Sequence, residues 1–151
     1  MSTLPVSHPQ HAMLTALAMA QAGMGDHDTA AALVTQIREA FGDDGVLESM
    51  TMWADAAGLF AWPDTPKGEP VGLTFRDGTT NQDVSVDDAT YGQRWAGRWI
   101  AARKAMDVDT ARALLDAAGA DRRTEECVAG VLYLAARTVD VALDDMIGGT
   151  E

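Results

Sequence analysis

The chain has 151 residues, the length of a single domain, and 47% of them are hydrophobic, which is ordinary for a globular protein. Acidic side chains outnumber basic ones by 23 to 11, a net charge of −12, and such a surface disfavours binding to nucleic acid or anionic lipid. No apolar run approaches the ~18 residues that a membrane span needs, and the single cysteine, Cys127, excludes an internal disulfide and fits a reducing compartment. With no basic region and apolar core at the start, we expect a cytoplasmic protein without membrane contact.

The charge is spread unevenly along the chain. Residues 1–90 carry a net charge of −10, residues 91–123 a net charge of +3, and residues 124–151 a net charge of −5. High Asp and Glu content usually serves solubility. The preference for Ala, Asp and Arg over Ile and Lys is typical of a high-GC bacterial genome or its phage.

A first unit, residues 9–60, is predicted to contain three helices. Apolar residues recur at helical spacing in each of them, and glycines separate the helices. Asp26 or Asp28 is expected to cap the second helix, since Asp accepts hydrogen bonds from the free N–H groups at a helix start. The Gly-Asp-Asp-Gly cluster at 42–45 predicts a turn before the third helix.

Residues 61–87 form a predicted insert of different character. Three prolines forbid a continuous helix. Alternating apolar residues at 71–75 and 84–86 surround an Asp-Gly turn at 77–78, which predicts a β-hairpin, with an ordered loop as the alternative. Because isolated hairpins are marginal in water, this one must lie against the helices or a partner.

A second unit, residues 87–148, is predicted to contain three more helices. Asp87 or Asp88 is expected to cap the first of them. The last helix, about 122–147, has a stripe within about 120° of a helical wheel. That stripe consists of Val128, Val131, Leu132, Ala135, Val139, Ala142, Leu143 and Met146.

An internal repeat links the two units. Residues 26–33 and 107–114 are identical at six of eight positions at an offset of 81, and three residues of 42–48 match residues of 119–125 at an offset of 77. The slip of four residues is about one helical turn. We therefore expect one mainly α domain, 1–151, a closed bundle of about six helices built from two tandem three-helix units with a pseudo-two-fold axis.

Catalytic, cofactor and metal motifs are not recognisable in the sequence, so no such site is predicted. The duplicated Asp-x-Asp-Thr follows helical rather than strand residues, which indicates helix caps rather than phosphatase chemistry. His8 and His11 have a metal-like gap, but Pro9 interrupts the helix that would align them, and no further ligand motif supports a metal site. These two histidines and His27 are expected to be solvated near a frayed terminus.

Two segments are candidate partner-binding surfaces. Arg94, Trp95, Arg98 and Trp99 combine the residue types of binding hot spots, although the same spacing fits a core helix with arginines along its rim. Cys127, Leu134 and Val141 form a second stripe that recurs every seven residues. It indicates either a central helix contacted on both sides or a dimer seam.

The sequence favours a non-catalytic interaction or regulatory protein of bacterial or phage origin that binds a partner protein, with a homodimer as one form. An alternative is a phage or mobile-element inhibitor that mimics nucleic acid with a contiguous acidic surface of Asp77, Asp83, Asp87 and Asp88. A second alternative is an enzyme on a helical bundle. It would need a pocket lined by several of Trp53, Trp62, Trp95, Tyr133 and His27, together with a buried acid.

Overall fold

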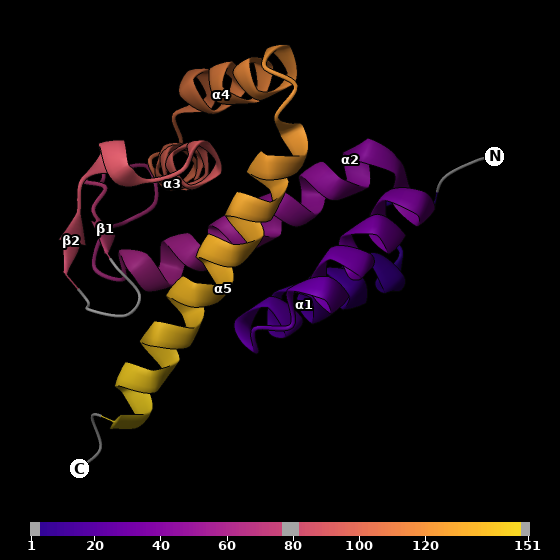
Figure 1. Cartoon of the computed structure of the whole chain (residues 1–151), viewed down its shortest axis with the longest axis horizontal. Coiled ribbons are helices and arrows are strands. Elements are labelled where there is room, and N and C mark those ends of the chain that lie inside the picture. The colour runs from indigo at the N-terminus through magenta and orange to yellow at the C-terminus, as the bar shows by residue number, and fades with distance from the viewer. Residues whose placement is uncertain (1–3, 77–81, 149–151) are drawn as a thin grey trace.

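The computed structural model describes residues 4–76 and 82–148, which fold into a mainly helical bundle (Figure 1). This part of the chain contains five α-helices, two very short strands and one 3₁₀ turn. In chain order these are α1 (Pro9–Gly23), α2 (His27–Ala61), β1 (Phe75–Arg76), β2 (Asp83–Val84), η1 (Val86–Asp88), α3 (Tyr91–Lys104), α4 (Val108–Ala120) and α5 (Thr124–Gly148).

Helix α2 merges two helices that the sequence analysis kept apart. The predicted turn at 42–45 is wrong in extent, because Gly42 alone leaves helical geometry, with φ 75° and ψ −172°. Its positive φ produces a kink that glycine tolerates. Gly45 is back in the helix and lies so close to Phe41 that an added Cβ would be 2.2 Å from that side chain's own Cβ. The described residues therefore hold five helices instead of six.

The α1–α2 and α3–α4 turns have the same geometry, as the repeat predicts. Gly25 and Met106, 81 positions apart, both have positive φ, at 83° and 57°. In each turn the following aspartate, Asp26 or Asp107, accepts a 3.1 Å hydrogen bond from the amide of a threonine three residues later. These threonine hydroxyl and amide hydrogen bonds lower the pKa of both aspartates. The duplicated Asp-x-Asp-Thr therefore supplies helix caps.

Beyond this turn the two halves differ. Gly42 kinks α2, whereas its match at an offset of 77, Gly119, lies inside α4. The chain turns three residues later, at Arg122, which has φ 55°. The start of α3 also differs from the prediction: Thr90 caps it with a capping box completed by Gln93, in place of Asp87 or Asp88.

Helix α5 crosses the middle of the bundle and packs against α1, α2 and α3 (Figure 1). Its proximal half supplies much of the core, in which the largest buried apolar side chains are Trp53, Trp99, Ile37, Leu132 and Val131. At the α3–α5 crossing the two backbones nearly touch. A Cβ added to Gly130 would lie 2.5 Å from the carbonyl oxygen of Gly92. The central-helix interpretation of α5 fits this packing.

The insert rests against α3. A single antiparallel pairing, Phe75 with Val84 and Arg76 with Asp83, forms the two-residue strands, and the predicted turn at 77–78 lies outside the described residues. Leu73 and Phe75 cover Gly97 so closely that an added Cβ would be about 3 Å from both. The glycine thus makes room for the insert on the helix.

Candidate functional site

The two tryptophans of the predicted α3 surface are core residues. Trp95 and Trp99 are both buried and stack with their ring centroids 5.6 Å apart. The indole N–H of Trp95 donates a 2.7 Å hydrogen bond to the Leu114 carbonyl, which ties α3 to α4. The structure therefore places neither ring where a partner could reach it.

The arginines beside them lie at the edge of this core. Arg94 is partly buried and Arg98 is exposed. Arg103 is the most firmly held, since its guanidinium donates to both carboxylate oxygens of Asp55, at 2.9 and 3.1 Å, and lies over the Trp99 ring. This arrangement fits the interpretation of α3 as an amphipathic core helix with arginines along its rim.

The stripe of α5 that recurs every seven residues passes from core to surface along the helix. Cys127 is buried, Leu134 is partly buried against the core, and Val141 is exposed. Burial, with the nearby Glu126 carboxylate as a smaller cause, raises the pKa of the Cys127 thiol to about 11. The thiol therefore stays protonated near neutral pH, the form that is the weaker nucleophile.

The main apolar stripe of α5 also passes from core to surface. Val128, Val131, Leu132 and Ala135 are buried, but further along the same face Leu143 is 42% exposed and Met146 is 66% exposed. Figure 1 shows the reason, because the C-terminal end of α5 projects beyond the other helices. We call Val139, Ala142, Leu143 and Met146 the distal α5 stripe. Val139 and Ala142 are partly buried, whereas Leu143 and Met146 are exposed, so the stripe continues the core-facing pattern as the covering helices end.

One aspartate lies along each edge of the distal α5 stripe. On a helical wheel Asp140 and Asp145 flank its two sides, and Asp144 lies on the opposite face. All three are exposed. The stripe is therefore an apolar surface with an acidic rim, and sequence patterning predicted its apolar face but not its exposure.

A buried polar cluster, missed by the sequence analysis, joins α1 to α2. His11 Nε2 lies 2.8 Å from the Gly45 carbonyl oxygen and 3.1 Å from Ser49 Oγ, and the Thr15 hydroxyl lies 2.7 Å from that of Ser49. The indole N–H of Trp53 donates to the Thr15 carbonyl. The expectation that His11 is solvated is wrong.

A serine and a histidine at this distance resemble a nucleophile and its base. However, His11, Thr15 and Ser49 are all almost completely buried, and the edge of the histidine ring packs against Phe41. A substrate has no route to the hydroxyl in this arrangement. The cluster instead satisfies polar groups inside the α1–α2 contact.

The other two histidines have separate structural roles. The His8 ring accepts a hydrogen bond from the Gln10 amide and caps α1. His27 stacks on Tyr133, with ring centroids 4.5 Å apart. No three potential metal ligands cluster anywhere in residues 4–76 and 82–148.

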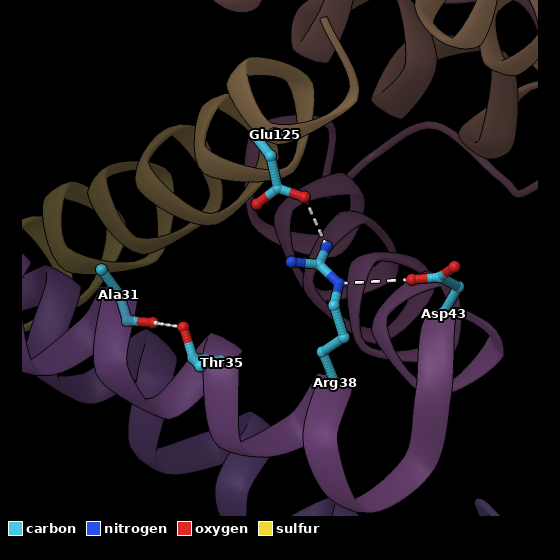
Figure 2. Close-up of polar contacts among 5 residues, drawn as sticks. All are labelled: Ala31, Thr35, Arg38, Asp43 and Glu125. Carbon is cyan, nitrogen blue, oxygen red and sulfur yellow. Dashed lines mark hydrogen bonds and ion pairs between the residues drawn. The ribbon is translucent and has the colours of Figure 1, made fainter. Parts of the chain in front are cut away.

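Arg38 connects the first half of α2 to the start of α5 (Figure 2). One guanidinium nitrogen lies 2.6 Å from Glu125 Oε1, and Nε lies 3.3 Å from Asp43 Oδ1. The hydrogen bond to Glu125 raises the pKa of Arg38. Both carboxylates are largely exposed, so these pairs orient the two helix ends more than they stabilise the fold.

The residues proposed for a catalytic pocket are scattered. Trp53 and Trp95 are buried in the core, Trp62 donates to the Gly72 carbonyl in the insert, and the exposed His27 stacks on Tyr133. Two cavities along α4 are lined by none of them. The structure therefore stacks His27 on Tyr133 but does not gather the five residues around either cavity.

Three of the four aspartates proposed for a nucleic-acid mimic, Asp83, Asp87 and Asp88, are exposed on β2 and η1. Asp77 lies outside the described residues. The phosphate-like spacing that this alternative requires stays a prediction.

Among the described residues, no helix has both the length and the apolar character that crossing a membrane requires. No protein-family model, curated protein or solved structure matches the chain.

Proposed function

We propose that this is a non-catalytic interaction protein that binds a basic partner protein through the distal α5 stripe. The observation that carries this proposal is the exposure of Leu143 and Met146 on the face that forms the core earlier in the same helix. Contiguous apolar surface left uncovered at the end of a helix is typical of a docking site for another helix.

The acidic rim favours a basic partner over a second copy of the chain. Pairing two distal α5 stripes would bring Asp140 and Asp145 of one copy toward the same residues of the other, and like charges at close range oppose association. A partner helix with Lys or Arg beside its apolar stripe would meet opposite charge along both edges. The net charge of −12 would also speed its approach at low salt.

The broader layout is also a proposal. The matching hydrogen bonds and caps of the α1–α2 and α3–α4 turns support descent of both halves from one duplicated helical unit. In that case α5, the counterpart of the part of α2 that follows Gly42, would have grown longer than the bundle needs, leaving its last turns for a partner.

A designed pair of amphipathic peptides tests the proposal directly. A helical peptide of leucine with flanking lysines is expected to bind the full chain with an affinity that falls as salt rises, whereas the same peptide with glutamates is expected not to bind. Replacing both Leu143→Gln and Met146→Gln should weaken binding of the lysine peptide by at least about tenfold, as measured by fluorescence anisotropy.

The chain offers a closely matched control. On α1, Leu17 is 42% exposed and Met13, one turn before it, is 55% exposed, close to the values for Leu143 and Met146. The double variant Met13→Gln, Leu17→Gln should bind the lysine peptide as the unmodified chain does. Equal loss in both double variants, or equal binding of both peptides, would overturn the proposal. If light scattering shows that the unmodified chain is a dimer and that only the α5 double variant is a monomer, the surface serves self-association instead.

A further inference from the structure

The inner face of helix α4 is incompletely packed against the rest of the bundle. Two adjoining cavities of about 180 and 220 Å³ lie along this face and share Arg103, Val108 and Ala111. We call this space the α4 groove. Its apolar floor consists of Leu47, Ala111 and Leu115, and the exposed Val108, Lys67 and Arg112 complete its lining with one apolar and two cationic side chains.

The internal repeat shows what is unusual about the α4 groove. Ala30 and Val34 of α2 are buried, whereas their counterparts 81 positions later, Ala111 and Leu115, are only partly buried. Val108, at the start of α4, is 63% exposed. The same segment therefore forms core in the first copy and lines an open groove in the second.

The polar groups of the α4 groove are mostly donors. Arg112 and Lys67 are exposed and form no ion pair with any residue the structure describes. Arg103 is paired with Asp55, and the one lining carboxylate, Asp107, is occupied as the α4 cap. The groove thus has a surplus of positive charge in a chain of net charge −12.

A second observation marks the same place. Trp99 lines the larger cavity, and its indole N–H is buried without an acceptor among the described residues. Such a donor carries an uncompensated desolvation cost. A ligand oxygen reached by a small shift of α4 would relieve this cost.

We propose that the α4 groove binds a small amphipathic carboxylate, with its apolar chain on the floor and its carboxylate held by Arg112. A guanidinium matches a carboxylate with two parallel hydrogen bonds. The cavities are smaller than the ~300–1,000 Å³ of typical drug-sized pockets, which suits a short acyl chain. This site lies on α4, and the proposal does not depend on the partner surface at the end of α5.

Octanoate is the probe, and the stacked Trp95–Trp99 pair beside the groove supplies the signal. Titration of the full chain with octanoate is expected to change tryptophan fluorescence saturably, with 1-octanol binding at least about tenfold more weakly for lack of the charged contact. Arg112→Gln should weaken octanoate binding by about five- to tenfold. Arg98→Gln, the same change at an exposed α3 arginine outside the groove lining, should leave it unaltered.

Filling the floor provides an independent arm. Ala111→Leu places added carbons in both cavities and should abolish saturable binding of octanoate, while circular dichroism reports that the helices remain. The proposal is overturned if binding does not saturate below about 1 mM octanoate, because a dissociation constant of that size is near the weak limit of specific binding. Equal effects of the Arg112 and Arg98 changes, or undiminished binding to the Ala111→Leu chain, overturn it as well.

Discussion

Gly130→Ala is expected to destabilise the protein by about 2–3 kcal/mol, although alanine is normally the better helix residue. The reason is the α3–α5 crossing. The new Cβ would lie 2.5 Å from the Gly92 carbonyl oxygen and 3.3 Å from the Ala96 Cβ. Because the nearest neighbour of the new Cβ is a backbone atom, the clash is relieved only if α3 and α5 move apart. The packing around Trp95 and Trp99 would then loosen. Urea denaturation measures the loss.

Gly119→Ala is the matched control for this prediction. Gly119 also lies inside a helix, but a Cβ added there meets no atom within 4 Å. The same substitution should therefore stabilise the chain by about 0.5–1 kcal/mol through helix propensity alone. If both substitutions shift the unfolding midpoint in the same direction, the close crossing of α3 and α5 is not a feature of the folded protein.

His11→Ala is expected to cost about 2–4 kcal/mol of folding free energy. Removing the ring deprives the Gly45 carbonyl of its 2.8 Å partner and leaves a cavity beside Phe41. It also removes one of two partners of the Ser49 hydroxyl, which keeps Thr15. Buried polar groups without partners carry their full desolvation cost, so the loss should exceed that of an ordinary surface change.

The control is three residues away. His8→Ala removes the same side chain from an exposed position where it accepts one hydrogen bond at the start of α1. It should cost no more than about 1 kcal/mol. If thermal unfolding shows equally small effects for both variants, the α1 terminus is as loosely held as the sequence suggested, and the buried cluster does not contribute to stability.

Local chemistry made part of this fold predictable. Asp26 and Asp107 are caps because an aspartate at a helix start satisfies free amides whatever surrounds it. The buried half of the α5 stripe, Val128 to Ala135, follows from periodicity. The capping box of Thr90 and Gln93 follows from the same local chemistry, but the sequence offers Asp87 and Asp88 as competing caps just before it.

Tertiary contacts decided the rest. Gly42 and Gly45 look like a turn, yet Gly42 alone leaves helical geometry and the chain is helical on both sides of this kink, where α2 packs against α1 and α5. His11 is buried only because Ser49 and Gly45, more than 30 positions away, lie opposite it. Periodicity likewise marks Leu143 and Leu132 as equivalent, and only the lengths of the neighbouring helices leave Leu143 exposed.

Site-specific cross-linking tests the central claim most directly. A photoreactive residue in place of Leu143, introduced in the cells that produce the protein, should give a discrete adduct with a basic protein. The lysine peptide should compete this adduct away in cell extract, and the glutamate peptide should not. The same residue in place of Leu17, which is equally exposed, should give no such adduct. Identical adducts from both positions, or an adduct at 143 only with the chain itself, would contradict the assignment of the distal α5 stripe as the surface for a basic partner.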